Sequence, residues 1–132
     1  MSDLAKKIAA ISAFLGALTI AIGAFGAHGL EKLVDQDTVA SYETAVRYQM
    51  YHVIALFIVA LLPGLGDKIL RQLFWAFLLG IVLFSGSIYL LALDEPMGIN
   101  MSFLGPVTPL GGLLLIAGWV RLGFGLLTIK RG

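Results

Sequence analysis

Four blocks of apolar residues, separated by short segments that carry nearly all of the charges, make up most of this chain. The blocks cover residues 8–27, 46–62, 73–93 and 103–120, and only the second contains a charged residue. An α-helix needs roughly 20 mainly apolar residues to cross the hydrocarbon core of a bilayer. The pattern therefore predicts four membrane-spanning helices joined by short connections.

The second block is the least uniformly apolar, so its helix has to be placed from the flanking residues. Asp37 or Thr38 can cap a helix that starts near residue 38, and the Pro/Gly-rich sequence at 63–66 ends it. Such a helix would measure about 37 Å at 1.5 Å per residue, so its first turns would stand outside the hydrocarbon. After Leu122 the sequence leaves two courses open, a continuation of the fourth helix or a path along the membrane interface.

The first block raises the question of a cleaved signal peptide. Lys6 and Lys7 precede it, and a basic start followed by an apolar core is also typical of secretory signals. The apolar core of a signal is usually about 7–15 residues long, and the block at 8–27 is longer. We therefore expect a retained span.

Composition excludes a water-covered globule. Of the 132 residues, 59% are hydrophobic and 13% are charged, whereas typical soluble domains have about 45–50% and about 25%. Lipid or a partner must cover such a surface. Four spans use most of the length, so we expect residues 1–132 to form a single integral membrane domain. The absence of cysteine excludes a disulfide framework and a thiolate metal site.

The charges are divided unevenly between the two ends of the predicted four-helix bundle. Four spans place the N-terminus, the 64–72 connection and the C-terminus on one side, which holds seven of the nine basic residues and two of the eight acidic ones. The positive-inside rule then predicts that both termini are cytoplasmic. So strong a bias also argues against insertion in both orientations. The basic residues on that side are Lys6, Lys7, Lys68, Arg71, Arg121, Lys130 and Arg131.

Small residues recur along the predicted spans. In lipid they let helix backbones approach closely, because van der Waals packing and weak hydrogen bonds replace the hydrophobic effect there. They can be interpreted as a dimerisation surface or as ordinary packing inside one bundle, and we favour the packing interpretation. The residues singled out for helix packing are Ala13, Gly16, Ala17, Gly23, Gly80, Gly86, Gly111, Gly112 and Gly118.

Polar side chains inside the spans are the candidate site, because such residues are costly in a membrane and often functional. The predicted topology puts all of them in the outer leaflet, where they could converge on one outward-facing cluster. One interpretation is a site for a small ligand or a proton, since histidine titrates near neutral pH. The other is that they bond to one another, to backbone carbonyls or to headgroups. The residues are His28, Gln49, His52, Ser85, Ser87, Tyr89 and Thr108.

Several kinds of chemistry are not expected. No third residue is spaced relative to His28 and His52 in a way that indicates a metal ligand, whereas catalytic zinc sites usually keep three protein ligands. No span carries a carboxylate at its middle that could relay protons. The glycine-rich stretch 23–29 lacks the Lys-Ser/Thr ending of a phosphate loop, and no basic stripe with interleaved aromatics suggests nucleic acid. We therefore assign no catalytic residue, no metal, no cofactor and no nucleic-acid partner.

Five stretches taken together resemble a known family: 23–30 (GAFGAHGL), 48–52 (YQMYH), 84–90 (FSGSIYL), 108–112 (TPLGG) and Gly118-Trp119. They are similar to the small membrane proteins of unknown function of the YgdD and YwdK type in bacteria, whose animal relatives are called transmembrane protein 256. The resemblance covers nearly the whole chain and implies a compact four-span protein of the bacterial inner (plasma) membrane. It implies no activity, and it draws attention to His28, His52, Ser85, Ser87 and Trp119.

The leading hypothesis for function is a non-enzymatic membrane protein, either a structural or accessory component or one that works through partner contacts. The lipid bilayer is its expected partner, together with a second copy of the chain or another membrane protein. The alternative is a small oligomeric transporter or channel, in which the His, Gln and Ser side chains form an outward-facing polar vestibule. An enzyme acting on lipid is the third hypothesis.

Overall fold

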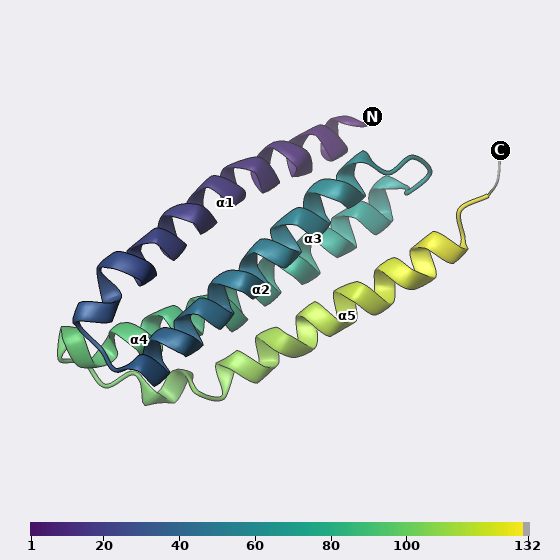
Figure 1. The fold of residues 1–132 in the computed structure, drawn as a ribbon. Coiled ribbons are helices and arrows are strands. Elements are labelled where there is room, and N and C mark those ends of the chain that lie inside the picture. The colour runs from purple at the N-terminus through teal and green to yellow at the C-terminus, as the bar shows by residue number, and fades with distance from the viewer. Residues whose placement is uncertain (131–132) are drawn as a thin grey trace.

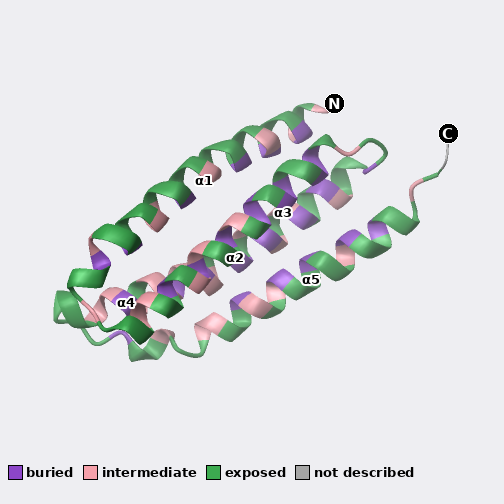
Figure 2. Cartoon of the chain, viewed as in Figure 1, coloured by how far each residue is buried: buried purple, intermediate pink, exposed green. Residues whose placement is uncertain are grey.

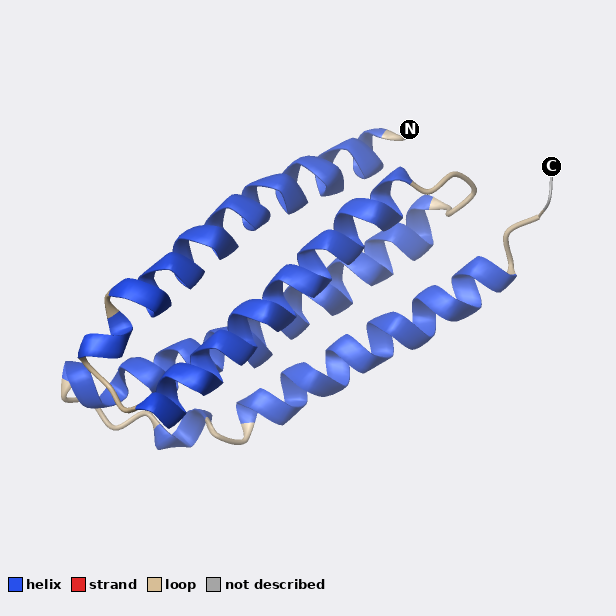
Figure 3. Ribbon diagram, viewed as in Figure 1, coloured by secondary structure: helices blue, strands red, loops and turns tan. Residues whose placement is uncertain are grey.

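The structure, a computed structural model that describes residues 1–130, is built from helices and has no strand in that range (Figure 3). Its elements are α1 (Asp3–His28), the 3-10 turn η1 (Leu30–Lys32), α2 (Gln36–Leu61), α3 (Asp67–Ile81), the π-helical segment η2 (Val82–Gly86), α4 (Ser87–Met97), the 3-10 turn η3 (Ser102–Leu104) and α5 (Val107–Leu127). Four helical segments are long and apolar enough to cross a membrane. The predicted class, an all-α protein with four spans, is confirmed.

The start of α2 differs slightly from the prediction. Asp35 is the N-cap, and its carboxylate accepts a hydrogen bond from the backbone N–H of Thr38 at 2.8 Å. Hydrogen bonding by Thr38 holds the pKa of this exposed carboxyl below its ordinary value. Asp35 rather than Asp37 takes the capping role, so the helix begins at Gln36, earlier than residue 38.

The third span is one continuous helical path with a π-helical segment in its middle. η2 joins α3 to α4 without a break, and the path ends where Gly98 adopts a left-handed backbone with φ 67°. It therefore extends well beyond the apolar block at 73–93 at both ends. A π turn contains an extra residue, which rotates the side chains that follow it relative to those before it.

The fourth span begins later and ends later than its apolar block. The 3-10 turn η3 precedes it, and Pro106 stands before the first residue of α5. Pro109 lies in the first turn, where its missing N–H has no intrahelical partner to lose. The helix then runs without interruption to Leu127, so the residues after Leu122 mainly extend it.

Buried positions along the helices follow the three-and-four spacing of a heptad repeat, which is typical of left-handed helix packing. In α5 the buried residues are Gly111, Leu115, Gly118, Leu122 and Gly125. In α1 they are Ala5, Ile8, Ser12, Thr19 and Gly26. These two helices therefore each offer a narrow stripe to their neighbours and leave most of their circumference exposed, whereas α2 is buried over a broader face.

The helices are arranged with α2 and the third span in the middle and with α1 and α5 on either side (Figure 1). α1 packs chiefly against α2, and α5 packs chiefly against α3 and η2. The N-terminus, the loop between α2 and α3 and the C-terminal end of α5 lie at the same end of the molecule (Figure 1).

The third span and α5 approach each other closely. A Cβ added at Gly111 would lie 2.7 Å from the carbonyl carbon of Leu83 and 2.8 Å from the Cα of Phe84. Along the same line, a Cβ at Gly118 would meet the ring of Phe77 at 2.5 Å. Large residues of one helix thus fit against glycines of the other, which brings the two backbones together.

The small residues predicted to pack have different surroundings. Gly80, Gly111 and Gly118 are buried at helix contacts, and an added Cβ at Gly23 would meet Val46 at 3.2 Å. The same atom at Gly16 or Gly112 would find only ordinary contacts at 3.8 Å, and at Gly86 it would find nothing within 4 Å. Ala13 and Ala17 are exposed on the outer face of α1. Gly26, which the sequence analysis did not single out, packs against the ring of Tyr42.

Large apolar side chains cover the outside of the molecule. Phe14 is 78% exposed, Phe124 63% and Leu127 83%, and exposed residues occupy the outer faces of the helices along their length (Figure 2). Apolar surface of this extent requires a hydrocarbon environment, as expected for a protein surrounded by lipid.

Candidate functional site

Five of the seven polar residues predicted to form one cluster are distributed over three separate contacts. The first, here called the Gln49 network, consists of Thr19, Gln49 and Tyr89; the others are the His52–Trp119 pair and the Ser87–Thr108 pair. Each contact joins a different set of helices, so together they tie the bundle at several points.

The Gln49 network connects α1, α2 and α4 through one side-chain amide. The Gln49 Nε2 donates to Thr19 Oγ1 at 2.8 Å, and the Tyr89 hydroxyl donates to Gln49 Oε1 at 2.6 Å. The Thr19 hydroxyl donates in turn to the carbonyl of Leu15 at 2.6 Å, so its oxygen is free to accept from the amide. The donors and acceptors match in one orientation of the amide only.

Further hydrogen bonds surround the Gln49 network. The Tyr42 hydroxyl donates to the carbonyl of Ile22 at 2.7 Å, and its ring centroid lies 5.0 Å from that of Tyr89. Ser85, inside η2, donates to the carbonyl of Ala45 at 2.7 Å. These bonds also run between helices, so the polar groups around Gln49 serve the contact between α2 and its neighbours.

The His52–Trp119 pair links α2 to α5 and fixes the state of the imidazole. His52 Nδ1 lies 2.6 Å from the carbonyl oxygen of Tyr48, and Trp119 Nε1 lies 3.0 Å from His52 Nε2. A carbonyl only accepts and an indole N–H only donates, so Nδ1 carries the proton and Nε2 accepts. The geometry therefore describes a neutral imidazole whose two nitrogens are both occupied.

The Ser87–Thr108 pair links α4 to α5. The two hydroxyl oxygens are 2.6 Å apart, and Ser87 Oγ lies 3.0 Å from the carbonyl of Phe84. Because Ser87 has one proton, donation to that carbonyl leaves Thr108 as the donor between the hydroxyls. Ser85 meanwhile bonds toward α2, so the two serines face different helices.

His28 stands apart from all three contacts. It is the last residue of α1 and is exposed, and it has no hydrogen bond in common with His52. His52 itself lies about 24 Å along α2 and about 14 Å from its end, at 1.5 Å per residue. It is therefore near the middle of the helix rather than near its outer end, because α2 begins well before the second apolar block.

The residues that the structure describes contain no group of three His, Cys, Asp or Glu side chains placed to hold a metal ion. Across the same part of the chain, every buried side-chain nitrogen and oxygen has a hydrogen-bond partner. The polar residues in the spans are thus engaged with the protein itself. Hydrogen bonds of this kind hold membrane helices together.

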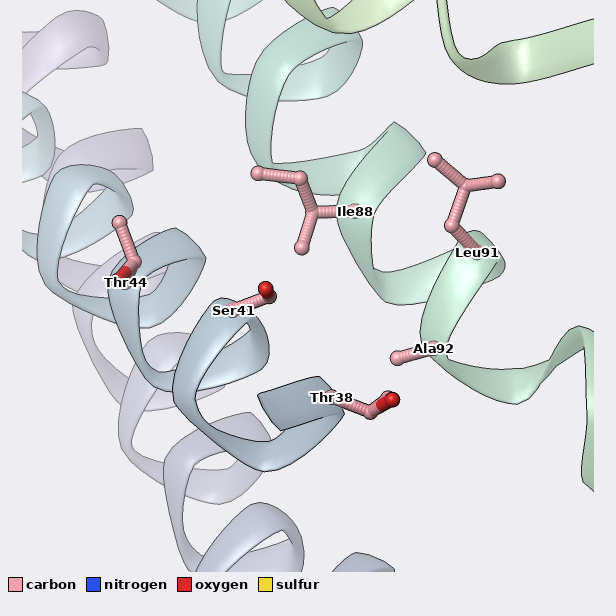
Figure 4. A pocket seen from close by; sticks show the side chains of 6 residues that line it. All are labelled: Thr38, Ser41, Thr44, Ile88, Leu91 and Ala92. Atoms are coloured by element: carbon pink, nitrogen blue, oxygen red, sulfur yellow. The ribbon is translucent and has the colours of Figure 1, made fainter. Parts of the chain in front are cut away.

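Two of the surface grooves between helices are lined partly by α2 and lie near these contacts. One, of about 510 Å³, lies between α2 and α5 and is mainly apolar; it is lined by Tyr48, Tyr51, His52, Phe84, Gly112, Leu115, Ile116 and Trp119. The other, of about 340 Å³, lies between α2 and α4. Figure 4 shows its two walls, with Thr38, Ser41 and Thr44 on one side and Ile88, Leu91 and Ala92 on the other.

Sequence reasoning missed two members of these contacts. Thr19 and Tyr42 belong to the hydrogen bonds around Gln49, and Thr19 is fully buried. Thr19 could have been found by the rule that directed attention to His52, since it is a polar residue in a charge-free span. Tyr42 lies before the second apolar block, but its spacing of seven residues from Gln49 puts it on the same face of α2.

Four apolar helices tied by interhelical hydrogen bonds define a polytopic helical membrane protein. The chain belongs to the family described as "Protein of unknown function (DUF423)", which it matches over residues 22–112. This confirms the resemblance inferred from the five sequence stretches. No specific activity is assigned to the family by that description.

Curated relatives align with most of the chain. UPF0382 membrane protein SH2409 of Staphylococcus haemolyticus is 40% identical over 89% of this chain and 92% of its own length. UPF0382 membrane protein YwdK of Bacillus subtilis is 38% identical over 89% and 93%. UPF0382 membrane protein C1782.12c of Schizosaccharomyces pombe is 40% identical over 85% and 94%. No solved structure matches the chain.

Proposed function

We propose that this protein is a non-enzymatic structural or accessory component of the membrane, which works through contacts of its outer surface with lipid or with another membrane protein. One observation carries the proposal. Of the six polar side chains that are buried among the described residues, five join helices and Ser12 bonds to the Ile8 carbonyl of its own helix, so none is left without a partner. A group that is already bonded on all sides has nothing to offer a substrate without first breaking the bundle's own contacts.

The His52–Trp119 pair illustrates this argument. A histidine that accepts a travelling proton at Nε2 would have to place a second N–H against the indole N–H of Trp119, 3.0 Å away. Two donors cannot share that position. The pair would have to separate before His52 could bind the proton. The imidazole is therefore poorly suited to relay protons and well suited to hold α2 and α5 together.

The proposal excludes transport, which can be measured with purified protein in liposomes. We expect proton flux, followed with the trapped dye pyranine, and calcein release to equal those of protein-free vesicles. This should hold at one pH below and one pH above the range where histidine titrates. A flux that is present in the parent and abolished by His52→Ala would overturn the proposal in favour of a transporter. Native mass spectrometry showing only monomer would argue further against transport, because a pore would need several copies.

We also propose that both termini face the cytoplasm and that the protein resides in the plasma membrane. The end of the molecule with the N-terminus and the α2–α3 loop carries basic residues in excess, and the opposite end carries acidic residues in excess. Basic loops are retained on the cytoplasmic side. One predicted member of the basic set, Arg131, lies outside the described residues.

Single cysteines can test this orientation, since the chain has none of its own. Leu33 is 56% exposed, and a side chain added at Gly66 would meet nothing within 4 Å. We expect a membrane-impermeant maleimide to label Leu33→Cys in intact spheroplasts and Gly66→Cys only after permeabilisation. The reverse pattern would place the termini outside, and labelling of both in intact cells would indicate dual insertion.

A further inference from the structure

The lipid-facing side of α3 changes in character along its length. Lys68, Arg71, Gln72 and Trp75 are all exposed, and their spacing of three, four and seven residues places them on one helix face. Leu79 and Val82 continue that face and are 44% and 55% exposed. Reading from the start of the helix, cations come first, then an indole, then aliphatic side chains.

A third cation reaches this surface from α5. The Arg121 Nε donates to the side-chain oxygen of Gln72 at 2.7 Å. The close contact of α3 with α5 sets the level at which the two meet, since Phe77 packs on Gly118 a short distance deeper in the bundle. The fold therefore brings Arg121 beside the exposed face of α3.

The hydrogen bond to Gln72 orients the guanidinium without neutralising it. An amide carries no net charge, so the positive charge of Arg121 remains available. The bond also uses only the Nε–H, which leaves the four N–H donors on the two terminal nitrogens. Those donors form the planar fork that binds phosphate oxygens in a bidentate manner.

Asp67 is the carboxylate nearest in sequence to these cations, and it is engaged elsewhere. Its Oδ1 accepts a hydrogen bond from the Ser2 hydroxyl at 2.7 Å. That bond joins the beginning of α1 to the beginning of α3, on the side of α3 that faces α1. Asp67 lies four residues before Arg71, so it borders the exposed face at its start, while the bond to Ser2 occupies one of its carboxylate oxygens. Three cations exceed this one carboxylate, so the face keeps a net positive charge.

The position of Trp75 indicates the depth of this surface. It is 51% exposed and lies about 10 Å beyond Lys68 along the helix axis, at 1.5 Å per residue. Tryptophan is enriched at the boundary between headgroups and hydrocarbon. The cations then lie at the level of the phosphates, and Leu79 and Val82 lie at the level of the acyl chains.

We propose that this surface, which we call the α3 basic face (Lys68, Arg71, Gln72, Trp75 and Arg121), is a binding site for an anionic glycerophospholipid. Lys68 and Arg121 bind the phosphate, Trp75 lies against the glycerol ester region, and the aliphatic residues beyond it contact one acyl chain. Three cations favour an anionic headgroup such as that of phosphatidylglycerol. A choline headgroup would place a like charge next to them.

The test is a lipid titration of the purified protein in a neutral detergent, followed by native mass spectrometry. We expect phosphatidylglycerol to bind more tightly than phosphatidylcholine with the same acyl chains. Lys68→Gln and Arg121→Gln should each weaken phosphatidylglycerol about fivefold, the effect of one basic residue near an anionic surface. Arg47→Gln is the matched control, because it removes one exposed cation from a different helix, in the half of α2 that is farther from the α2–α3 loop, and it should leave the affinity unchanged.

Gln72→Glu separates binding from folding. The new carboxylate would pair with Arg121, which keeps or raises thermal stability while cancelling the charge that the phosphate needs. We expect at least a fivefold loss of phosphatidylglycerol affinity with an unchanged or higher unfolding temperature. Glycerol 1-phosphate, the soluble headgroup fragment, should not compete at concentrations comparable to the lipid.

Three outcomes would overturn the proposal. Equal affinity for the two lipids would remove the basis for an anionic ligand. Equal effects of Lys68→Gln, Arg121→Gln and Arg47→Gln would show a general charge effect and no site. Full competition by glycerol 1-phosphate at lipid-like concentrations would show a site for a soluble phosphate. None of these outcomes bears on the liposome flux test, so the two proposals fail independently.

Discussion

Gly111→Ala is expected to destabilise the protein by about 3 kcal/mol or more, at the upper end of the range for overpacked positions. The added Cβ would lie 2.7 Å from the carbonyl carbon of Leu83 and 2.8 Å from the Cα of Phe84. Both are backbone atoms, so no side chain can rotate to make room. α5 and η2 would have to move apart, which would also disturb the Ser87–Thr108 pair. Thermal or denaturant unfolding in a mild detergent measures the loss.

The neighbouring glycine provides the control. At Gly112 the added Cβ would meet the side chain of Phe84 on the neighbouring segment at 3.8 Å, an ordinary van der Waals distance. Because both variants add one methyl group to the same turn of α5, helix propensity changes equally in the two. Gly112→Ala should therefore keep parental stability or gain slightly. Equal unfolding temperatures for the two variants would contradict the close approach of α5 to η2.

Gln49→Leu is expected to cost about 2 kcal/mol, because a side chain of similar size replaces the centre of a three-helix hydrogen-bond network. Tyr89 would lose the acceptor for its hydroxyl, and Thr19 would lose the donor that approaches its oxygen. The cost comes mainly from the buried hydroxyl left without a partner. Interhelical hydrogen bonds in membranes are otherwise worth only about 0.6 kcal/mol on average.

A double-mutant cycle isolates the contact between Gln49 and Tyr89. Once Tyr89→Phe has removed the hydroxyl, Gln49→Leu no longer leaves a buried hydroxyl without an acceptor. The double variant should therefore lose less stability than the sum of the losses in the two single variants. We expect a coupling of about 1 kcal/mol. Tyr51→Phe is the control, since Tyr51 is 54% exposed, and it should change stability by less than about 0.5 kcal/mol. Strict additivity in the cycle would show that the two side chains do not interact.

The local elements of this protein could largely be predicted from sequence. Apolar length alone identified four spans, and the breaker sequence at 63–66 correctly placed the end of α2. The errors at helix starts are small and have local causes. Asp35, and not Asp37, caps α2. The 3-10 turn at Ser102–Leu104 precedes α5, so that helix begins later than its apolar block.

The candidate site was harder to predict, because the polar residues can be identified in the sequence but their partners cannot. Residues close in sequence diverge in the fold. Gln49 bonds toward α1 and α4, while His52, less than one turn later, bonds toward α5. Ser85 and Ser87 diverge in the same way. Where the sequence predicted a single outward-facing cluster, the structure has three contacts, each between a different set of helices.

The sequence by itself determined the class of protein, the number of spans and the uneven distribution of charge, since all three depend on composition counted along the chain. Only the tertiary structure decided which face of each helix points inward and which polar groups meet. In water, a helix reveals its buried face by being apolar on that side alone. In a bilayer, the lipid and the protein interior are both apolar, so a span is hydrophobic on all sides and its sequence does not distinguish them. The buried side of each span is set instead by where glycine lets a neighbouring backbone approach and where hydrogen-bonding groups find partners, and both depend on helices far apart in the chain.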